Sequence, residues 1–122
     1  MTEPEMFPKA DARPSDPTTS RIAAAALDMG DRETARRRGQ RIVSAALTAG
    51  PATDDELRER IAAAGPPAQM AHGSVAKRRL DLEREGLVRV LLATDGREVM
   101  RLTRSGTPAR VYCLSGWGVA GD

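Results

Sequence analysis

The sequence contains one cysteine, Cys113, and one histidine, His72. A single cysteine cannot build an intrachain disulfide framework or a thiolate zinc cluster. A single histidine excludes an HExxH metal site and a histidine-ligated cofactor site, and no nucleophile–base pair can be built around it. The glycines form no phosphate-binding loop. We therefore expect no enzyme, no cofactor and no metal site.

Aromatic residues and long apolar runs are also scarce. The aromatic residues are Phe7, Tyr112 and Trp117, too few for a base-stacking surface that binds RNA or single strands. The longest unbroken apolar run, 22–27, is far shorter than the roughly 20 residues that span a bilayer. The acidic N-terminus lacks the apolar segment of a secretory signal. These absences predict a soluble cytoplasmic protein that does not enter a membrane.

Positive charge is concentrated in the part of the chain best suited to folding. The 122 residues include 19 Lys and Arg and 17 Asp and Glu, a net charge of +2. Residues 1–31 hold 3 basic and 6 acidic groups, whereas residues 32–113 hold 16 basic and 10 acidic groups. Arginine supplies 17 of the 19 cations, and its forked guanidinium suits phosphate and base contacts. The length predicts one domain.

The first 30 residues predict a tail followed by a short helix. Residues 1–19 contain four of the eight prolines among acidic and hydroxyl side chains. Such a composition cannot bury enough apolar area to order the backbone, so we expect a disordered tail. Ser20 then precedes an alanine-rich stretch, 21–29, and Gly30 follows it. These start and stop signals predict a short helix or linker over 20–30, marginal by itself.

The expected domain, 31–115, begins with two helices. Apolar residues recur at helical spacing through 33–49, and Gly50 follows them. Thr53 and Glu56 predict a capping box that opens the second helix, because each side chain can accept the backbone N–H of the other residue. The expected buried positions are Ile42, Val43, Ala46 and Leu47 in the first helix and Leu57, Ile61 and Ala64 in the second.

A third helix is predicted over 75–85, with Ser74 as its N-cap and Gly86 after its end. Placed on a helical wheel, its apolar side holds Val75, Ala76, Leu80, Leu82 and Leu87, and its polar side holds Lys77, Arg78, Asp81, Arg84 and Glu85. Arg79 and Glu83 fall in the apolar sector, one turn apart. We expect them to form a partly buried pair that positions this helix against the first long helix.

After the third helix the apolar pattern changes to a period of two, which is typical of strands. The expected order is a strand at 88–92, a hairpin turn at Asp95-Gly96, an extended segment at 99–103, a second turn at 105–108 and a closing strand at 111–114. Cys113 in the closing strand is expected to pack as a small hydrophobe. The glycines of 116–122 predict a flexible C-terminus.

Three short helices followed by a β-hairpin is the element order of a winged helix-turn-helix. The segment 73–88, GSVAKRRLDLEREGLV, resembles the recognition helix of small winged helix-turn-helix proteins of bacteria and bacteriophages. It has a polar start, basic residues on the expected exposed face, and LExxGLV leading into the wing. The segment 103–112, TRSGTPARVY, is similar to the wing and final strand of such proteins. The resemblance covers residues 33–115 and implies an α+β fold with a three-helix core and a hairpin wing.

The resemblance implies contacts to double-stranded DNA from two elements. The recognition helix would place Ser74, Lys77 and Arg78 at base edges and Arg84 nearer the DNA backbone. The hairpin would offer four arginines to phosphates or to the minor groove: Arg97, Arg101, Arg104 and Arg110. Asp81 on the same helix face opposes this, because it would repel phosphate unless it accepts a hydrogen bond from cytosine. The alternative is a solvated helix face on which Lys77 pairs with Asp81.

The resulting hypothesis is a sequence-selective double-stranded DNA-binding protein that acts as a transcriptional or phage-type regulator. An excision or replication accessory factor would share this mechanism. The alternative from another class is a winged-helix module that binds and inhibits a host protein, which the weak net charge, Asp81 and the apolar segment 22–29 favour. A homodimer is expected, because a single small domain makes few phosphate contacts. Its expected interface residues are Ile22, Leu27 and Met29.

Two charged clusters have structural explanations besides functional ones. The four arginines of 36–41 begin a helix, where positive charge opposes the helix dipole. A phosphate partner and a pairing with Asp31 and Glu33 are both open explanations. The acidic residues of 54–59 also lie at a helix start, where they complement the dipole, and we expect capping there rather than a metal site. His72 is expected to be solvated.

Overall fold

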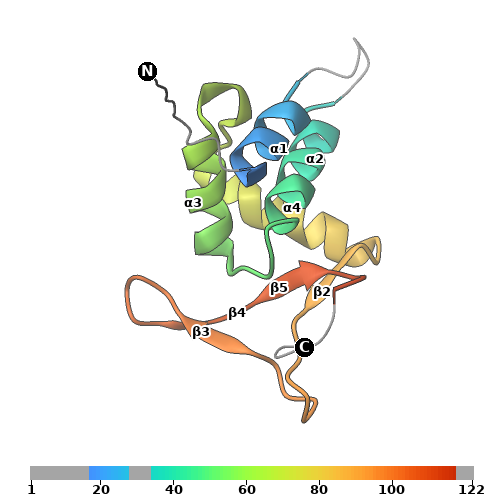
Figure 1. The fold of residues 1–122 in the computed structure, drawn as a ribbon, viewed down its shortest axis with the longest axis vertical. Coiled ribbons are helices and arrows are strands. Elements are labelled where there is room, and N and C mark those ends of the chain that lie inside the picture. Colours follow the sequence, from blue (N-terminus) through green and yellow to red (C-terminus); the bar gives the residue numbers. More distant parts are fainter. Residues whose placement is uncertain (1–16, 28–33, 118–122) are drawn as a thin grey trace, which may run out of the picture.

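The computed structural model describes residues 17–27 and 34–117, apart from the side chain of Pro67. This part of the chain is α+β, with the helices packed together and short antiparallel strands below them in Figure 1. The helices are α1 (Pro17–Ala25), α2 (Ala35–Leu47), α3 (Asp54–Ala64), the short 3₁₀ helix η1 (Pro66–Ala68) and α4 (His72–Arg84). The strands are β2 (Val88–Val90), β3 (Met100–Leu102), β4 (Pro108–Arg110) and β5 (Tyr112–Leu114). This order is compatible with the expected winged helix-turn-helix.

Helix α1 is part of the folded domain. It begins at Pro17, so residues 17–19 are helical and do not belong to the predicted tail. Proline suits the first helical position because its φ is already helical and the N–H that it lacks would have no partner there. Ile22 is fully buried and Ala26 is 4% exposed, and both belong to the main core. The helix is therefore held by tertiary packing, which a nine-residue helix needs.

Two predicted boundaries in this region are wrong. Ser20 lies inside α1 and does not cap it, and the folded domain includes α1 instead of beginning at residue 31. The rest of the predicted tail, 1–16, lies outside the described residues, as does the segment 28–33 with Met29, Gly30, Asp31 and Glu33. The predicted C-terminal segment is described only as far as Trp117. None of the helices in the described ranges is long and apolar enough to cross a membrane.

Arginines of α2 bind the C-terminal end of α1. Arg38 Nε donates to the Ala26 carbonyl oxygen at 2.9 Å, and Arg41 donates to the carbonyls of Ala25 and Leu27. The last carbonyls of a helix have no intrahelical partner and carry partial negative charge, so guanidinium groups stabilise them. This contact gives two of the four clustered arginines a structural role that neither open explanation had included.

Helices α2 and α3 begin with side-chain caps. Thr34 caps α2 by accepting a hydrogen bond from the Arg37 N–H at 3.1 Å. The predicted capping box of α3 is confirmed, because Thr53 Oγ1 accepts from the Glu56 N–H at 3.2 Å and the Glu56 carboxylate accepts from the Thr53 N–H at 3.0 Å. The predicted core positions are confirmed as well: Ile42, Val43, Ala46, Leu47, Leu57 and Ile61 are buried, and Ala64 packs partly buried against them.

Helix α4 begins at His72, three residues before the predicted start. Its N-cap is Ala71, whose side chain makes no capping bond, so the predicted cap at Ser74 is wrong. Ser74 instead lies in the first turn of the helix. The helix ends at Arg84, and Gly86 follows with a φ of 81°, the left-handed conformation that glycine adopts most easily. The predicted stop is therefore confirmed.

Helix α4 is rotated relative to the predicted orientation. Val75 and Leu82 are buried as predicted, but Leu80 and Leu87 are 38% and 53% exposed. Asp81, which the pattern placed outward, is only 8% exposed. The cause is the packing of α4 against both α2 and α3, since the side facing α2 holds polar side chains that find charged partners there. Apolar spacing alone cannot indicate such partners.

The strands pair as antiparallel ribbons. Strand β2 pairs with β5 and β3 pairs with β4. A bridge between Leu92 and Glu98 closes the predicted turn at Asp95-Gly96, which is confirmed. A further bridge joins Ala52, between α2 and α3, to Tyr112 of β5. This bridge fixes the strands to the helical layer.

The ribbons meet at a closed ring of backbone hydrogen bonds. Leu91 donates to Val111, Val111 donates to Val99, and Val99 donates to Leu91, with N–O distances of 2.8, 3.3 and 2.9 Å. The side chains of Leu91 and Val111 form a second, smaller core with Cys113, and Val99 packs against it. Cys113 is fully buried, which confirms its predicted packing, and burial raises the pKa of its thiol.

Candidate nucleic-acid interface

The solvent-facing side of α4 carries two cations. Lys77 and Arg84 are exposed, and within the described residues neither forms an ion pair or a hydrogen bond. Leu80 lies between them, because positions three and four apart share a helix face, and Gly73 precedes them at the helix start. We call Gly73, Lys77, Leu80 and Arg84 the outer stripe of α4. It is the part of the predicted recognition helix that a ligand can reach.

Arg78 does not lie on the outer stripe, contrary to the prediction. Its side chain is 20% exposed, and its Nε lies 3.0 Å from a carboxylate oxygen of Asp81. The aliphatic part crosses α2 at Gly39, where an added Cβ would come within 2.8 Å of Arg78 Cγ and 3.2 Å of Met70 Cε. Glycine at this point of α2 therefore makes room for Arg78. The arginine joins two helices and is not presented to solvent as a base-reading side chain would be.

Asp81 binds two arginines and faces away from the outer stripe. In addition to its ion pair with Arg78, it accepts hydrogen bonds from Arg36 of α2, at 3.2 Å from Nε and 3.3 Å from a terminal nitrogen. The alternative pairing of Asp81 with Lys77 is therefore absent, and Asp81 does not lie on the face that a phosphate would approach. The Arg36 side chain remains 63% exposed. Two guanidinium groups around one carboxylate leave this place positively charged.

A hollow beside Arg36 and Arg78 is lined by basic side chains. It has a volume of about 220 Å³ and lies between the first turns of α2 and α4 and the loop that leads into α4. Arg36 and Arg38 from α2 and Ser74 and Arg78 from α4 line it. Ser74 is half-buried there, so the structure brings it to the flank of α4 rather than to the outer stripe. An anionic oxygen would meet donors from two helices in this hollow.

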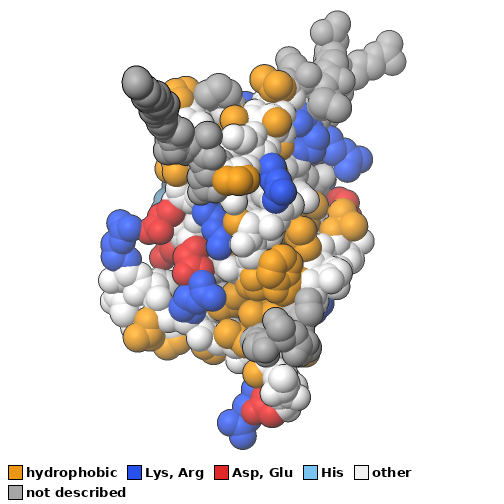
Figure 2. Space-filling view, viewed as in Figure 1, with side chains coloured by type: hydrophobic (Ala, Val, Ile, Leu, Met, Phe, Trp, Pro, Cys, Tyr) orange, Lys and Arg blue, Asp and Glu red, His pale blue; other side chains and the backbone are white. Residues whose placement is uncertain are grey.

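The hairpin arginines are bound to carboxylates. Arg101 pairs with Glu56 and Arg104 with Glu59, both on α3. Arg110 pairs with Glu98 across the hairpin at 3.1 Å, and attraction to that carboxylate and the hydrogen bond to it raise the pKa of Arg110. Acidic and basic side chains lie side by side at the left of Figure 2, where α3 meets the hairpin. Three of the four predicted hairpin arginines thus have a hydrogen-bonded carboxylate partner within the protein.

Arg97 is the exception among the hairpin arginines. Its side chain is 88% exposed, and its Nε lies 3.6 Å from the carboxylate of Asp95 in the same turn. An ion pair that open to solvent contributes little, so it would exchange readily for another anion. Arg97 is therefore the hairpin cation that is most accessible to a phosphate.

Arg79 forms the junction between α4, α3 and the strands. It pairs with Glu83 at 2.8 Å, as predicted, and also with Asp54 of α3 at 2.8 Å. Its guanidinium carbon lies 3.8 Å from the centre of the Tyr112 ring. Burial acts to lower the pKa of Arg79, but the two carboxylates outweigh it and raise the pKa. The predicted pair is confirmed, but it holds α4 against α3 and β5 and not against α2.

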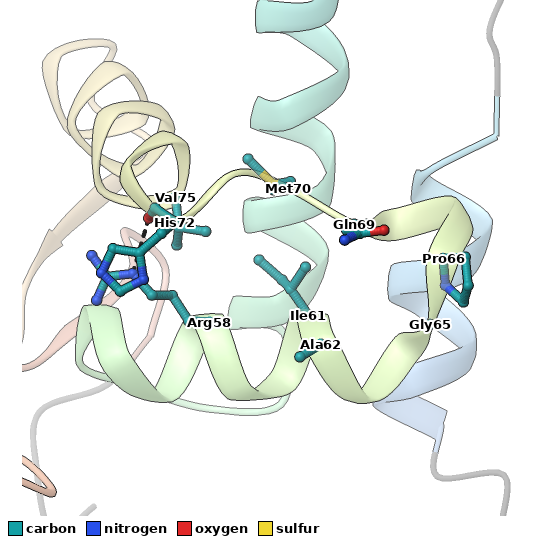
Figure 3. A pocket seen from close by; sticks show the side chains of 9 residues that line it. All are labelled: Arg58, Ile61, Ala62, Gly65, Pro66, Gln69, Met70, His72 and Val75. Carbon is teal, nitrogen blue, oxygen red and sulfur yellow. Dashed lines mark hydrogen bonds between the residues drawn. The ribbon is translucent and has the colours of Figure 1, made fainter.

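A second, larger hollow lies between α3 and the start of α4. It has a volume of about 430 Å³, with Ile61 and Met70 along it, as Figure 3 shows. Arg58 and His72 stand at one end, where Arg58 Nε donates to the His72 carbonyl oxygen at 3.0 Å, and Gln69 stands at the other. His72 is exposed, in the first position of α4 rather than in a loop. This hollow offers no pair of groups for acid–base chemistry.

The acidic residues at the start of α3 serve structure. Each pairs with a different arginine: Asp54 with Arg79, Asp55 with Arg58, Glu56 with Arg101 and Glu59 with Arg104. Among the residues that the structure describes, no three His, Cys, Asp or Glu side chains gather to hold a metal ion. The expectation that the chain is not an enzyme stays a prediction.

The sequence left a phosphate partner as one of two explanations for Arg36, did not indicate its pairing with Asp81, and misplaced Arg78. Asp81 is 45 residues from Arg36, and no local pattern indicates a pairing at that separation. The prediction of Lys77 and Arg84 as exposed side chains is confirmed. Comparison of the chain with protein-family models, with curated proteins and with solved structures finds no match.

Proposed function

We propose that the chain binds double-stranded DNA as a winged helix-turn-helix, with the outer stripe of α4 in the major groove. The observation that carries the proposal is the pair of exposed, unpaired cations, Lys77 and Arg84, on the helix that the expected fold presents to DNA. A helix fits the width of the major groove, and Lys and Arg are the side chains that most often bind guanine there. The proposal assigns base contacts to Lys77 and a contact at or near the backbone to Arg84.

Phosphate contacts are assigned to the flanks of α4. On one side, Arg36 and the arginine-lined hollow with Ser74 offer donors to a phosphate, and in the hairpin Arg97 is accessible. The full chain has a net charge of +2, and residues 32–113 hold 16 basic and 10 acidic groups. This local excess of positive charge favours approach to a polyanion. The paired arginines of the hairpin are given no role in the complex.

A protein partner is the second candidate, and one observation favours it. Leu80 is 38% exposed at the centre of the outer stripe, and Leu87 just beyond the helix is 53% exposed. Apolar side chains in the middle of a surface rimmed by cations are typical of a protein-binding patch. Under this alternative, Leu80→Ala weakens binding more than Lys77→Ala does.

The test is a fluorescence titration of duplex DNA with the full chain. A duplex selected from a random pool is compared with its scrambled version at several salt concentrations. Lys77→Ala is expected to cost about 1–3 kcal/mol on the selected duplex and to relax the preference at one base position. Arg21→Ala is the matched control. The Arg21 guanidinium is exposed and donates a hydrogen bond to Thr48. Thr48 follows the C-terminal end of α2, whereas Arg36 lies near its N-terminal end. Equal and weak binding of the unmodified chain to both duplexes would contradict sequence-selective binding.

A further inference from the structure

One face of the β3–β4 hairpin is apolar and uncovered in the described part of the chain. The register pairs Met100 with Arg110 and Leu102 with Pro108. Directly opposite residues point to the same side of a sheet, and so do residues two apart in one strand. The same rule adds Leu92 and Glu98, which face each other across the neighbouring bridge. We call this surface the outer hairpin face: Leu92, Glu98, Met100, Leu102, Pro108 and Arg110.

The opposite face of the same hairpin is turned toward the protein. Leu91 and Val111 are buried and Val99 is partly buried in the second core, while Arg101 reaches Glu56 on α3. Side chains alternate along a strand, so Met100 and Leu102 must point away from the helices. They are 50% and 69% exposed, among the largest values for apolar side chains in the structure. In Figure 2 hydrophobic side chains lie along the lower margin, over the hairpin.

The charges on the outer hairpin face are balanced. Its charged residues, Glu98 and Arg110, form an ion pair 3.1 Å long that remains about half exposed. The face therefore brings no net charge into a contact between two copies. A two-fold axis that bisects the line between Glu98 and Arg110 would bring Glu98 of one copy toward Arg110 of the other.

We propose that the outer hairpin face is a homodimer interface, packed against the same face of a second copy. A two-fold interface must be self-complementary, and apolar side chains around one acidic and one basic residue satisfy that requirement. The pairing of Arg101 and Arg104 with α3 holds the hairpin in the orientation that presents this face. The proposal replaces the expected interface of Ile22, Leu27 and Met29, because Ile22 is fully buried in the core of its own chain. It does not depend on DNA binding.

Sedimentation of the full chain without DNA tests the proposal. A face with few apolar side chains belongs to the small, weak interfaces, so concentrations from about 1 to about 500 µM are needed. We expect a reversible dimer and a dissociation constant raised about a hundredfold or more by Leu102→Ser, since the substitution removes the side chain from both halves. Leu27→Ser is the matched control, because Leu27 is 61% exposed on another surface and its replacement leaves the dimer unchanged. An unmodified chain that stays monomeric throughout this range overturns the proposal.

A charge-reversal pair guards against a folding effect of Leu102→Ser. Glu98→Arg makes the face doubly positive and Arg110→Glu makes it doubly negative, so each variant alone is expected to be monomeric. Mixed in equal amounts, the two variants are expected to form a mixed dimer, which requires both chains to be folded. If the mixture stays monomeric while the unmodified chain dimerises, the dimer uses another surface and the proposal is wrong. Failure of DNA binding would leave these outcomes unaffected.

Discussion

At the scale of single residues, Gly39 shows how one side chain can reverse a general preference. Glycine inside a helix is usually less favourable than alanine by up to about 1 kcal/mol. At Gly39 the added methyl group would lie 2.8 Å from Arg78 Cγ and 3.2 Å from Met70 Cε. Because Cγ is close to the backbone of α4, the arginine cannot move aside without losing its place beside Asp81. Glycine is therefore favoured at position 39 because Arg78 packs closely against the backbone of α2, and not because the backbone needs an unusual φ.

We predict that Gly39→Ala destabilises the fold by about 1–3 kcal/mol, the usual cost of overpacking. The matched control is Gly73→Ala in the first turn of α4, where an added Cβ meets nothing within 4 Å. That variant is expected to be as stable as the unmodified chain or more stable by up to about 1 kcal/mol. Chemical denaturation of the three chains measures both effects. A stabilising Gly39→Ala would mean that Arg78 does not pack against α2.

At the scale of elements, Glu56 couples the start of α3 to the hairpin. Its carboxylate accepts the Thr53 N–H within the capping box and also binds Arg101 of β3. Burial acts to raise the pKa of Glu56, but the hydrogen bonds from Arg101 and from the Thr53 backbone, with the charges of Arg101 and Arg60, lower it below the ordinary 4.5. One side chain thus stabilises a helix end and the position of a neighbouring hairpin.

The lowered pKa predicts a loss of stability in acid. A carboxyl group whose pKa is lower in the folded state stabilises that state above its unfolded pKa, and this contribution is lost as the pH falls through the folded value. Thermal melts of the unmodified chain are therefore expected to shift downward below pH 4.5. Glu56→Gln should start from a lower melting temperature at pH 7 and lose less below pH 4.5. Glu59→Gln is the control, since Glu59 pairs with Arg104 but takes no part in the capping box. Parallel curves for the unmodified chain and Glu56→Gln would contradict this role.

The elements that the sequence predicts correctly are those with local signals. The capping box at Thr53, the Asp95-Gly96 turn and the apolar face of α2 each depend on residues within one or two turns of each other. The orientation of α4 depends instead on Asp81 and its partner Arg36, which are 45 residues apart. Of the candidate site, the exposure of Lys77 and Arg84 could be predicted, whereas the burial of Arg78 and the pairing of the hairpin arginines with α3 could not.

At the scale of the whole molecule, α1 completes the core. The sequence presents its apolar residues as a marginal helix, yet the structure buries Ile22 completely, and Arg38 and Arg41 bind the carbonyls at the end of α1 and just past it. We predict that Ile22→Ala costs about 2–5 kcal/mol, as expected for a buried isoleucine. Leu27→Ala, two residues past the end of the helix and 61% exposed, should cost less than about 0.5 kcal/mol. Equal effects in denaturant unfolding would show that α1 does not pack as described.

The distribution of ion pairs over the molecule also determines which arginines can contribute to the salt dependence of DNA binding. A cation that neutralises a phosphate releases about one counterion, so its removal reduces the magnitude of the salt slope by about one. Arg36 is 63% exposed. If Arg36 binds a phosphate, Asp81 still has its ion pair with Arg78. Arg104 can reach a phosphate only by leaving Glu59, which would then stand unpaired beside the DNA and repel it.

We therefore predict that Arg36→Ala reduces the slope by about one, whereas Arg104→Ala leaves it unchanged. Titrations of the selected duplex at four or more salt concentrations compare the variants. An equal loss of slope in Arg104→Ala would show that the hairpin releases α3 and binds the phosphates, which would return the hairpin to the DNA interface.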